Sequence, residues 1–449
     1  MKQSVIASAV VAILLGLPAD GFATGFMILN QNGSGMGNSY AGAGAAAEDA
    51  STIFFNPAGL TYLPGRQFVV SGNLVYSSVE FSNAASTPPA LPPGSTLGSL
   101  GGDAGDLAFL PAAYLSWQLN PSTYLGIGVN TPFGLKTEYD AGWMGRFYAL
   151  KSEAKSVNIN PSVAFKVNET FSVGFGVDYQ WFKTELTNSV NYAAAAAGAC
   201  VPQPACIGPA LGAVGAQTEG VASLEGDDWA WGYNLGVMIN AGAARIGLTY
   251  RSSFTYTLTG NASFSNRPAV LSAQIPDGPI ESSIKLPALV SSSIAYQINP
   301  RWQMLADVTW TQWSDLKQVD VIRTDSGAQL SSLVFNWRDT WRVGLGFNYQ
   351  MNEAWKFRVG AAYEQTPTND ANRDPRLPDP DRLWSAFGVQ YRVGKQGAID
   401  VGYSHSWRTA SINQAPPNIS ANTAVANGQL VGNVQNDVDI IAVQYRYDF

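Results

Sequence analysis

The side chains that most often carry out chemistry are scarce in this chain of 449 residues. It contains two cysteines, Cys200 and Cys206, and a single histidine, His405. Thiolate and imidazole groups are the usual ligands of zinc, but the pair in "ACVPQPACIG" has no further soft ligands to complete a site. The sequence therefore predicts no metal site. Nothing in it resembles a phosphate-binding loop or implies a cofactor.

The lone histidine is also a poor general base. His405 lies between Ser404 and Ser406 in a stretch with strand-like alternation. Adjacent residues of a strand point to opposite faces, so neither serine forms a ready dyad with the imidazole. Because a hydrolase needs an activated nucleophile, we predict that the protein is not an enzyme, and a lipase is the alternative.

The first residues predict export. Lys2 is followed by an apolar run at 5–17 and by the small-residue site Gly21-Phe22-Ala23. This is the order of a signal peptide. The alternative is a membrane anchor, but the run is too short for a span of ~20 residues. We predict that residues 1–23 are a signal peptide cleaved after Ala23.

The composition narrows the class of protein further. Charged residues make up 13% and aromatic residues 12%, which is poor in charge for a soluble secreted protein. The net charge of -7 and the pI near 4.9 argue against a nucleic-acid partner. In the oxidising compartment that export implies, Cys200 and Cys206 are expected to form a disulfide bond.

Most of the chain after Arg66 alternates with a period of two, as strands do. In "WRVGLGFNYQ", from Trp341 to Gln350, every second residue is large and apolar, and Arg, Gly, Asn and Gln lie between. A soluble sandwich would bury the apolar face, whereas a membrane barrel turns it to lipid and turns the polar face to a lumen. No second long apolar run follows the signal peptide. A closed barrel is therefore the way in which this chain could span a membrane.

Short and long connections alternate between these strands. Six short turns contain Asn120, Asn168, Ala241, Asn299, Asn352 and Gly394. Longer polar or Pro-rich links fall between them, at 81–106, 140–148, 188–226, 261–280, 324–329, 367–380 and 413–432. Short turns at one end and long loops at the other are typical of outer-membrane barrels. We therefore predict an all-β fold, a 14-stranded antiparallel transmembrane β-barrel over residues 66–449.

A barrel of this size has a lumen too wide for strand side chains to fill, so it is either open or plugged. Residues 24–65 lack strand alternation and are rich in glycine, which permits tight turns and close packing. Asn56-Pro57 ends any preceding helix, because the residue before proline is driven out of the helical region. We predict that residues 24–65 form an N-terminal hatch of short helices and turns inside the lumen.

The end of the chain predicts a location. The last segment, "IIAVQYRYDF", alternates and stops on Phe449. A terminal aromatic residue after such a strand resembles the signal that outer-membrane proteins present to the barrel-insertion machinery. Together with the signal peptide, it predicts an integral protein of the bacterial outer membrane that contacts this machinery through Phe449.

One long stretch resembles a known family. "GFMILNQNGSGMGNSYAGAGAAAEDASTIFFNPAGL" is similar to the N-terminal hatch of the FadL/TodX family of outer-membrane transporters. The resemblance continues in order through "NTPFGLKTEYDAGWMGRFYA", "WGYNLG", "LTYRSS", "WSDL", "PDPDRLW" and "DVGYS" and covers the mature chain. It implies uptake of long-chain fatty acids or aromatic and aliphatic hydrocarbons. The implied mechanism is ligand-gated, passive lateral diffusion through a gap in the barrel wall.

The resemblance also assigns roles in the hatch. In this family the hatch plugs the barrel, and its extreme N-terminus reaches into the ligand pocket. That role falls on Phe26 in this sequence. The turn of the family falls on Asn56, Pro57 and Ala58, which either take part in gating or only fix the fold of the plug.

The family's third strand is kinked, which opens the wall. Here that strand reads "GIGVNTPFGL", and we expect regular pairing to fail between Asn130 and Gly134. Pro132 removes a backbone donor, and Gly134 weakens packing on either side of Phe133. An ordinary proline-containing strand end is the alternative.

Matching the strands to the family places four apolar residues in the ligand pocket: Leu186, Leu224, Leu333 and Phe335. Burying the apolar surface of a ligand against such residues contributes ~25 cal/mol per Å².

A basic side chain for a fatty-acid carboxylate is not evident. The two places where the family supplies one fall on Asn188 and Leu333, and Lys183, Lys317 or Arg338 could substitute. An uncompensated buried carboxylate is costly, so this departure raises the expectation of a neutral substrate.

The remaining expectations concern partners and rival functions. The Ala-rich loop "NYAAAAAGACVPQPACIG" is either a first landing site for ligand or simple padding. We expect the partners to be a hydrophobic small molecule and outer-membrane lipid, and the protein to be a monomer. The rivals are a general diffusion porin for small polar solutes and a soluble secreted β protein.

Overall fold

The computed structural model describes residues 25–200 and 203–449. The predicted signal peptide, with its cleavage point, lies outside the described residues.

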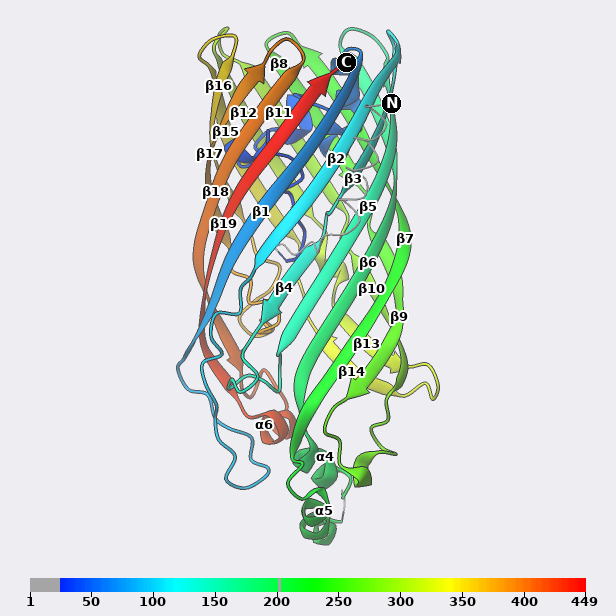
Figure 1. Ribbon diagram of the computed structural model, residues 1–449, viewed down its shortest axis with the longest axis vertical. Helices are drawn as coiled ribbons and strands as arrows, with labels where there is room; N and C mark the ends of the chain where they lie inside the picture. The colour runs from blue at the N-terminus through cyan, green and yellow to red at the C-terminus, as the bar shows by residue number, and fades with distance from the viewer. Residues whose placement is uncertain (1–24, 201–202) are drawn as a thin grey trace.

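The described residues form one closed antiparallel β-barrel of 14 strands, as predicted (Figure 1). Five of these strands are each interrupted, so the wall consists of 19 segments. The interrupted strands are β3/β4, β8/β9, β10/β11, β12/β13 and β14/β15. The segments are β1 Arg66–Asn83, β2 Leu107–Asn120, β3 Thr123–Asn130, β4 Gly134–Glu138, β5 Lys151–Lys166, β6 Phe171–Asn191, β7 Glu219–Ala241, β8 Ala244–Arg251, β9 Phe254–Phe264, β10 Gly278–Leu286, β11 Leu289–Gln297, β12 Trp302–Thr311, β13 Gln318–Arg323, β14 Gln329–Val334, β15 Thr340–Gln350, β16 Trp355–Glu364, β17 Arg382–Val393, β18 Gly397–Gln414 and β19 Leu430–Asp448.

The barrel closes where the first strand meets the last. β1 pairs with β19 over its whole length, from Gln67 opposite Asp448 to Asn83 opposite Gly432. An antiparallel seam of this kind requires an even number of strands. It leaves no free edge at this point of the wall.

The connections follow the predicted alternation. Short turns lie at the end of the barrel where the C-terminus is found, and the long links lie at the opposite end (Figure 1). The long links carry α4 Tyr192–Gly198, η3 Pro204–Cys206, α5 Ile207–Val214, η4 Ala269–Leu271 and α6 Ala421–Asn427. β6 and β7 extend further than the sequence indicated, so the link between them covers 192–218 rather than 188–226.

The alternation of the strands sorts side chains between lipid and lumen. On β15, Trp341, Val343 and Leu345 are half exposed on the outside, while Arg342 is buried on the inside. The outward row is apolar because it faces hydrocarbon, and the inward row is polar because it faces the lumen. Among residues 25–200 and 203–449, no helix is both long and apolar enough to cross a membrane.

The hatch fills the end of the lumen near the short turns (Figure 1). It consists of η1 Met36–Asn38, α2 Ala43–Ala46, α3 Thr52–Phe55 and η2 Pro57–Tyr62, and β1 follows at Arg66. Asn56 has an extended backbone (φ -160°, ψ 102°) and separates α3 from η2, as the proline after it requires.

Buried ion pairs and close backbone contacts hold the hatch to the wall. Glu48 of the hatch lies 2.7 Å from Arg358 and 3.2 Å from Lys356, both on β16. Gly360, on the same strand, leaves room for the hatch, because a Cβ there would lie 2.3 Å from the backbone of Asn38. The plug is therefore fitted to the inward face of particular strands.

Candidate functional site

An apolar cavity lies inside the barrel, between the hatch and the long loops. It contains about 900 Å³ of space, including its mouth. Its wall comes from β4 to β7, β9, β10, β13 and β14, with the hatch at one end and the 365–381 link at the other. The apolar lining residues are Phe26, Leu135, Ala154, Phe182, Leu186, Leu224, Leu258, Ile280, Ile284, Val319, Val321, Leu333, Phe335 and Leu377. Leu186, Leu224, Leu333 and Phe335, which the sequence placed in a pocket, therefore surround one cavity.

Aromatic rings close the cavity towards the hatch. Phe26 lies 5.2 Å from Trp313, 5.9 Å from Trp337 and 6.1 Å from Phe182, between ring centroids. Such tilted and stacked contacts stabilise aromatic clusters beyond the area they bury. The N-terminal end of the hatch is thus part of the cavity wall, which sequence reasoning expected of Phe26. Sequence reasoning did not find Trp313 and Trp337, because these two residues lie in breaks between strand segments.

The strand pairing of the barrel wall is interrupted beside this cavity. β3 pairs with β5 as far as Asn130, and β4 resumes the pairing at Gly134. On the other side, β2 pairs with β3 only from Ala113 onward, so residues 107–112 have no strand partner there. In the described part of the chain, β4 pairs with β5 alone. The interval between residues 107–112 and β4 is therefore a gap in the strand pairing of the wall, and the Lys136–Asp106 ion pair lies at one end of it.

The hatch and a serine satisfy the backbone groups of the break. Ile28 N–H donates to the Pro132 carbonyl at 2.8 Å, and Gly134 N–H donates to the Phe26 carbonyl at 2.9 Å. The Phe133 N–H donates to the Ser156 hydroxyl at 2.9 Å. The first residues of the hatch therefore pair with the kinked segment through a single β-bridge, Met27 opposite Phe133, so the backbone of Phe26 is tied to the edge of the gap.

The gap is lined by apolar side chains on the inside. Ala108 and Leu110 of β2 are buried, and they belong to the same cluster as Phe133, Leu135 and Phe26. The cavity and the gap are thus neighbouring parts of one apolar region.

Arg376, which sequence reasoning missed, brings a positive charge to the cavity wall. Its Nη2 donates to Asn188 at 3.0 Å, and its Nη1 lies 3.2 Å from the Thr187 carbonyl and 3.3 Å from the Ser152 hydroxyl. Its Nε is buried and has no partner among the described residues. None of the carboxylates in the described part of the chain forms a salt bridge with Arg376. Burial lowers the pKa of the Arg376 guanidinium, although nearby Asp374 partly offsets this.

The three basic residues suggested by the sequence lie elsewhere. Lys183 pairs with Glu225 at 3.5 Å, Lys317 donates to the Trp337 carbonyl at 3.3 Å, and Arg338 bonds to the Thr366 carbonyl at 3.4 Å. None of the three lines the apolar cavity. Matching strand by strand could not find Arg376, because its loop folds back into the lumen.

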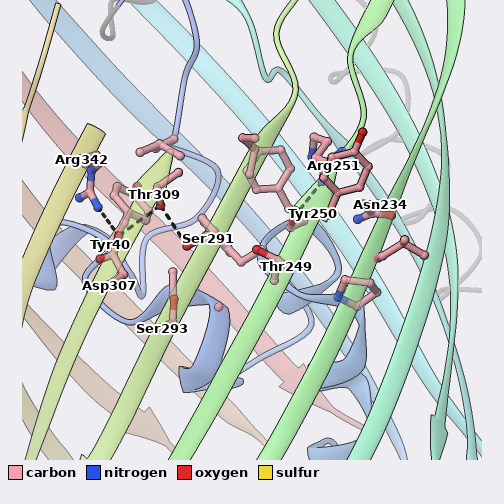
Figure 2. Close-up of a pocket in the computed structure, with 18 residues that line it drawn as sticks. Tyr40, Asn234, Thr249, Tyr250, Arg251, Ser291, Ser293, Asp307, Thr309 and Arg342 are labelled. Atoms are coloured by element: carbon pink, nitrogen blue, oxygen red, sulfur yellow. Dashed lines mark hydrogen bonds and ion pairs between the residues drawn. The ribbon is translucent and has the colours of Figure 1, made fainter. Parts of the chain in front are cut away.

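A second cavity of about 570 Å³, lined by both polar and apolar side chains, lies between the hatch and the wall (Figure 2). Arg342 donates to Asp307 at 2.9 Å, and Thr309 lies 2.9 Å from Ser291, so one row of polar side chains crosses adjacent strands (Figure 2). An aliphatic chain would leave these groups without water, at a cost in free energy. The apolar cavity is thus the better site for a greasy ligand.

Asn56, Pro57 and Ala58 do not line the apolar cavity. The Asn56 amide donates to the Gly44 carbonyl at 2.7 Å and to the Val237 carbonyl of β7 at 3.2 Å. Its oxygen accepts from the Ala58 N–H at 3.0 Å. The turn therefore links α2, η2 and the wall.

Comparison with known proteins identifies the family. The model of the family described as outer membrane protein transport protein (OMPP1/FadL/TodX) matches residues 17–449. The chain belongs to this family. The predicted family, the transport function and the outer-membrane location are thereby confirmed, and a general diffusion porin is not favoured.

Relatives of the OMPP1/FadL/TodX family match along almost the whole chain. The long-chain fatty acid transport protein of Salmonella typhi is 26% identical, over 91% of this chain and 93% of its own. The crystal structure of a FadL homologue from Pseudomonas aeruginosa has a TM-score of 0.83 at 23% identity and covers 94% of this chain and 99% of that one. The toluene transporter TodX of P. putida has a TM-score of 0.67 at 19% identity, with coverage of 89% and 94%.

Two features that could suggest other chemistry fit this family of transporters. His405 Nδ1 lies 2.7 Å from Asp439 on the outer face of β18, whereas Ser404 and Ser406 are buried on the inner face. Cys200 and Cys206 are joined by a disulfide bond in the loop after β6, outside the strands. Neither group contributes to the apolar cavity.

Proposed function

We propose that the protein takes up hydrophobic molecules by passive lateral diffusion. A ligand enters the apolar cavity from the long loops and displaces Phe26. The hatch segment that bonds to the kinked strand shifts with it, and the ligand leaves through the gap into the membrane. An aliphatic molecule gains no free energy from crossing a watery pore, so an exit to lipid fits its chemistry.

One observation carries this proposal: the same few residues belong to cavity, hatch and gap. Phe26 lines the cavity, while its carbonyl accepts from Gly134 at the edge of the gap. Gln31 adds a second link, because its amide donates to the Thr131 carbonyl at 2.7 Å. A ligand that moves Phe26 must disturb these bonds. This contact supports gating by the ligand without another energy source.

The substrate class that we propose is an aliphatic carboxylate, with neutral hydrocarbons second. Arg376 is the feature that favours the acid, since a guanidinium binds a carboxylate through charge-assisted hydrogen bonds. Its present partners are neutral oxygens that a ligand could replace or supplement. Proteins similar to this chain include one named long-chain fatty acid transport protein and two titled toluene transporters, so both classes of ligand occur in the names of relatives.

The lateral exit is tested by repairing the kink. In the variant Pro132→Val with Gly134→Val, the wall strand regains a backbone donor and side-chain packing. We expect uptake of radiolabelled oleate by cells that carry no other uptake protein to fall at least about tenfold. A heat-modifiable, folded barrel should persist in gels.

The matched control is Pro161→Val. Pro161 lies in β5, in a section that is paired with β3. The Pro161→Val substitution should leave uptake unchanged. Undiminished uptake by the folded Pro132→Val/Gly134→Val protein would rule out the lateral route.

We also propose roles for the Ala-rich loop, for the turn of the hatch and for the end of the chain. We place the first landing of ligand on the disulfide-closed loop. We assign to Asn56, Pro57 and Ala58 the transmission of hatch movement to β7. We expect a monomer surrounded by outer-membrane lipid. Phe449, 64% exposed at the end of the last strand, is free to meet the insertion machinery.

A further inference from the structure

The wall has a notch beside β18, which β19 and β1 separate from the gap next to β2. β16 ends at Glu364 and β17 begins at Arg382, but β18 continues to Gln414. β17 pairs with β18 only as far as Ser406, so residues 407–414 have no strand neighbour on that side. The 365–381 link fills only the inner part of this interval. The result is an open depression of about 1130 Å³.

Three arginines line the depression, and two of them lack a carboxylate partner. Arg373 is occupied by Asp370 and by the Ser411 and Asp379 carbonyls. Arg338 has one bond of 3.4 Å from Nε to a backbone carbonyl. Arg408 is exposed, and no hydrogen bond or ion pair of its side chain is found among the described residues.

The acidic groups in the depression are already engaged. Asp381 accepts from the Tyr363 hydroxyl at 2.7 Å and from the Thr366 N–H at 2.8 Å. Asp370 is held by Arg373. The depression therefore carries three guanidinium groups against two carboxylates, and Arg338 and Arg408 are the members without a carboxylate partner. Arg408 has the inward parity of Ser404 and Ser406 on β18, but it is exposed to the depression because β17 ends before it.

The lipid-facing residues of β18 and β19 show how deep the notch lies. Ile441 and Val443 are half exposed and apolar, whereas Asp439 and Asp437, the next outward positions, are charged. The hydrocarbon boundary therefore lies near Asp439, which pairs with His405. Arg408 comes three residues later, about 10 Å along a strand and ~7 Å along the membrane normal for a tilt near 45°. That distance corresponds to the headgroup layer.

Apolar side chains continue from the notch towards the hydrocarbon. Tyr363, Leu383 and Trp407 are 41%, 42% and 53% exposed on the outer face. A molecule with its anionic group at the arginines could lay an acyl chain against these residues.

We propose that this notch binds the phosphate group of an outer-leaflet lipid through Arg338 and Arg408. Guanidinium groups match phosphate oxygens in geometry and charge. The depth of the notch and its continuity with the apolar outer face favour a lipid-borne phosphate over free phosphate. The bound lipid would seal the wall where β17 is too short to do so.

The test uses the whole purified protein in detergent micelles. Binding of bisphosphorylated lipid A is measured by native mass spectrometry for wild type, for Arg338→Gln, for Arg408→Gln and for the double variant. Arg392→Gln is the matched control, because Arg392 is an exposed arginine at the other end of β17. We expect the double variant to bind at least about tenfold more weakly and the control to bind like wild type.

Two further arms decide between sources of the phosphate. Dephosphorylated lipid A should bind wild type as weakly as the double variant binds the phosphorylated form. Inorganic phosphate at millimolar concentration should not displace the lipid. Equal binding by all variants, equal loss in Arg392→Gln, or displacement by inorganic phosphate would overturn the proposal. Because both side chains are exposed, heat modifiability should show that each variant is folded.

Discussion

We expect Arg376 to decide which ligand chemistry the cavity accepts. It is the one basic residue on the cavity wall within the described chain, and its partners are neutral. In Arg376→Met, affinity for a long-chain fatty acid should fall ~10- to 100-fold, because a hydrogen bond to a charged group contributes ~1.5–3 kcal/mol. Affinity for a neutral alkane of equal length should stay the same.

Competition with a fluorescent fatty acid measures both affinities, and Arg392→Met serves as the control. A parallel loss for acid and alkane would mean that Arg376 only supports the 365–381 link and makes no contact with a carboxylate.

Asp379 links the position of the hatch to pH. Its carboxylate accepts from the Gly25 N–H at 2.9 Å and pairs with Arg382 at 3.1 Å. Burial raises the pKa of Asp379 to about 6, against ~3.9 in an unfolded chain, although Arg382 opposes this. The Gly25 N–H itself lowers the pKa of Asp379, so it favours the carboxylate form, and this contact between hatch and link strengthens as pH rises through about 6.

Hydrogen exchange of residues 25–31, corrected for the intrinsic rate, should thus be slower at pH 7.5 than at pH 5. In Asp379→Asn this difference should disappear. If the variant keeps the full pH dependence, another group is responsible.

The resemblance to the family, rather than any local pattern, selected Phe26, Leu186, Leu224, Leu333 and Phe335. All five line one cavity, and their role in binding a ligand stays a prediction. Arg376 was not predictable in the same way, because nothing in its Pro-rich surroundings signals that the loop turns inward.

At the scale of strands, alternation and turn spacing predicted the number of strands and the positions of the short turns. They did not predict most of the breaks. Pro132 and Gly134 indicated the break between β3 and β4, but the break between β12 and β13 is made by a short 3-10 helix, Trp313–Asp315. Period-two alternation continues on both sides of such a break, so the sequence pattern predicts one continuous strand where the structure has two segments. The tryptophans in these breaks are the ones that reach Phe26.

At the scale of the molecule, one buried charge cluster decides whether the lumen is closed. Burial opposes ionisation of Glu48, but Lys356 and Arg358 together hold its pKa well below its usual range. In Glu48→Gln, Arg358 keeps Asp400 as its partner and Lys356 loses its own. Removing one member of a buried pair costs about 3 kcal/mol, so the hatch should loosen while the strands stay paired.

Planar-bilayer recordings measure the result. Wild type should conduct ions hardly at all, and Glu48→Gln should show frequent open events. Glu353→Gln, in the short turn after β15, is the control and should resemble wild type. Large steady conductance in the wild type would instead favour a porin.

The seam between β1 and β19 constrains how the protein can be made. Gln67 and Asp448 share a side-chain hydrogen bond although 381 residues separate them in the chain. Contacts between such distant positions form late, since their loop-closure cost precedes any gain. The hatch precedes β1, so it is exported before every strand and is already present when the ring closes. A hatch that has not docked by then can enter the lumen only through an end of the barrel, and β1 tethers it to the end with the short turns.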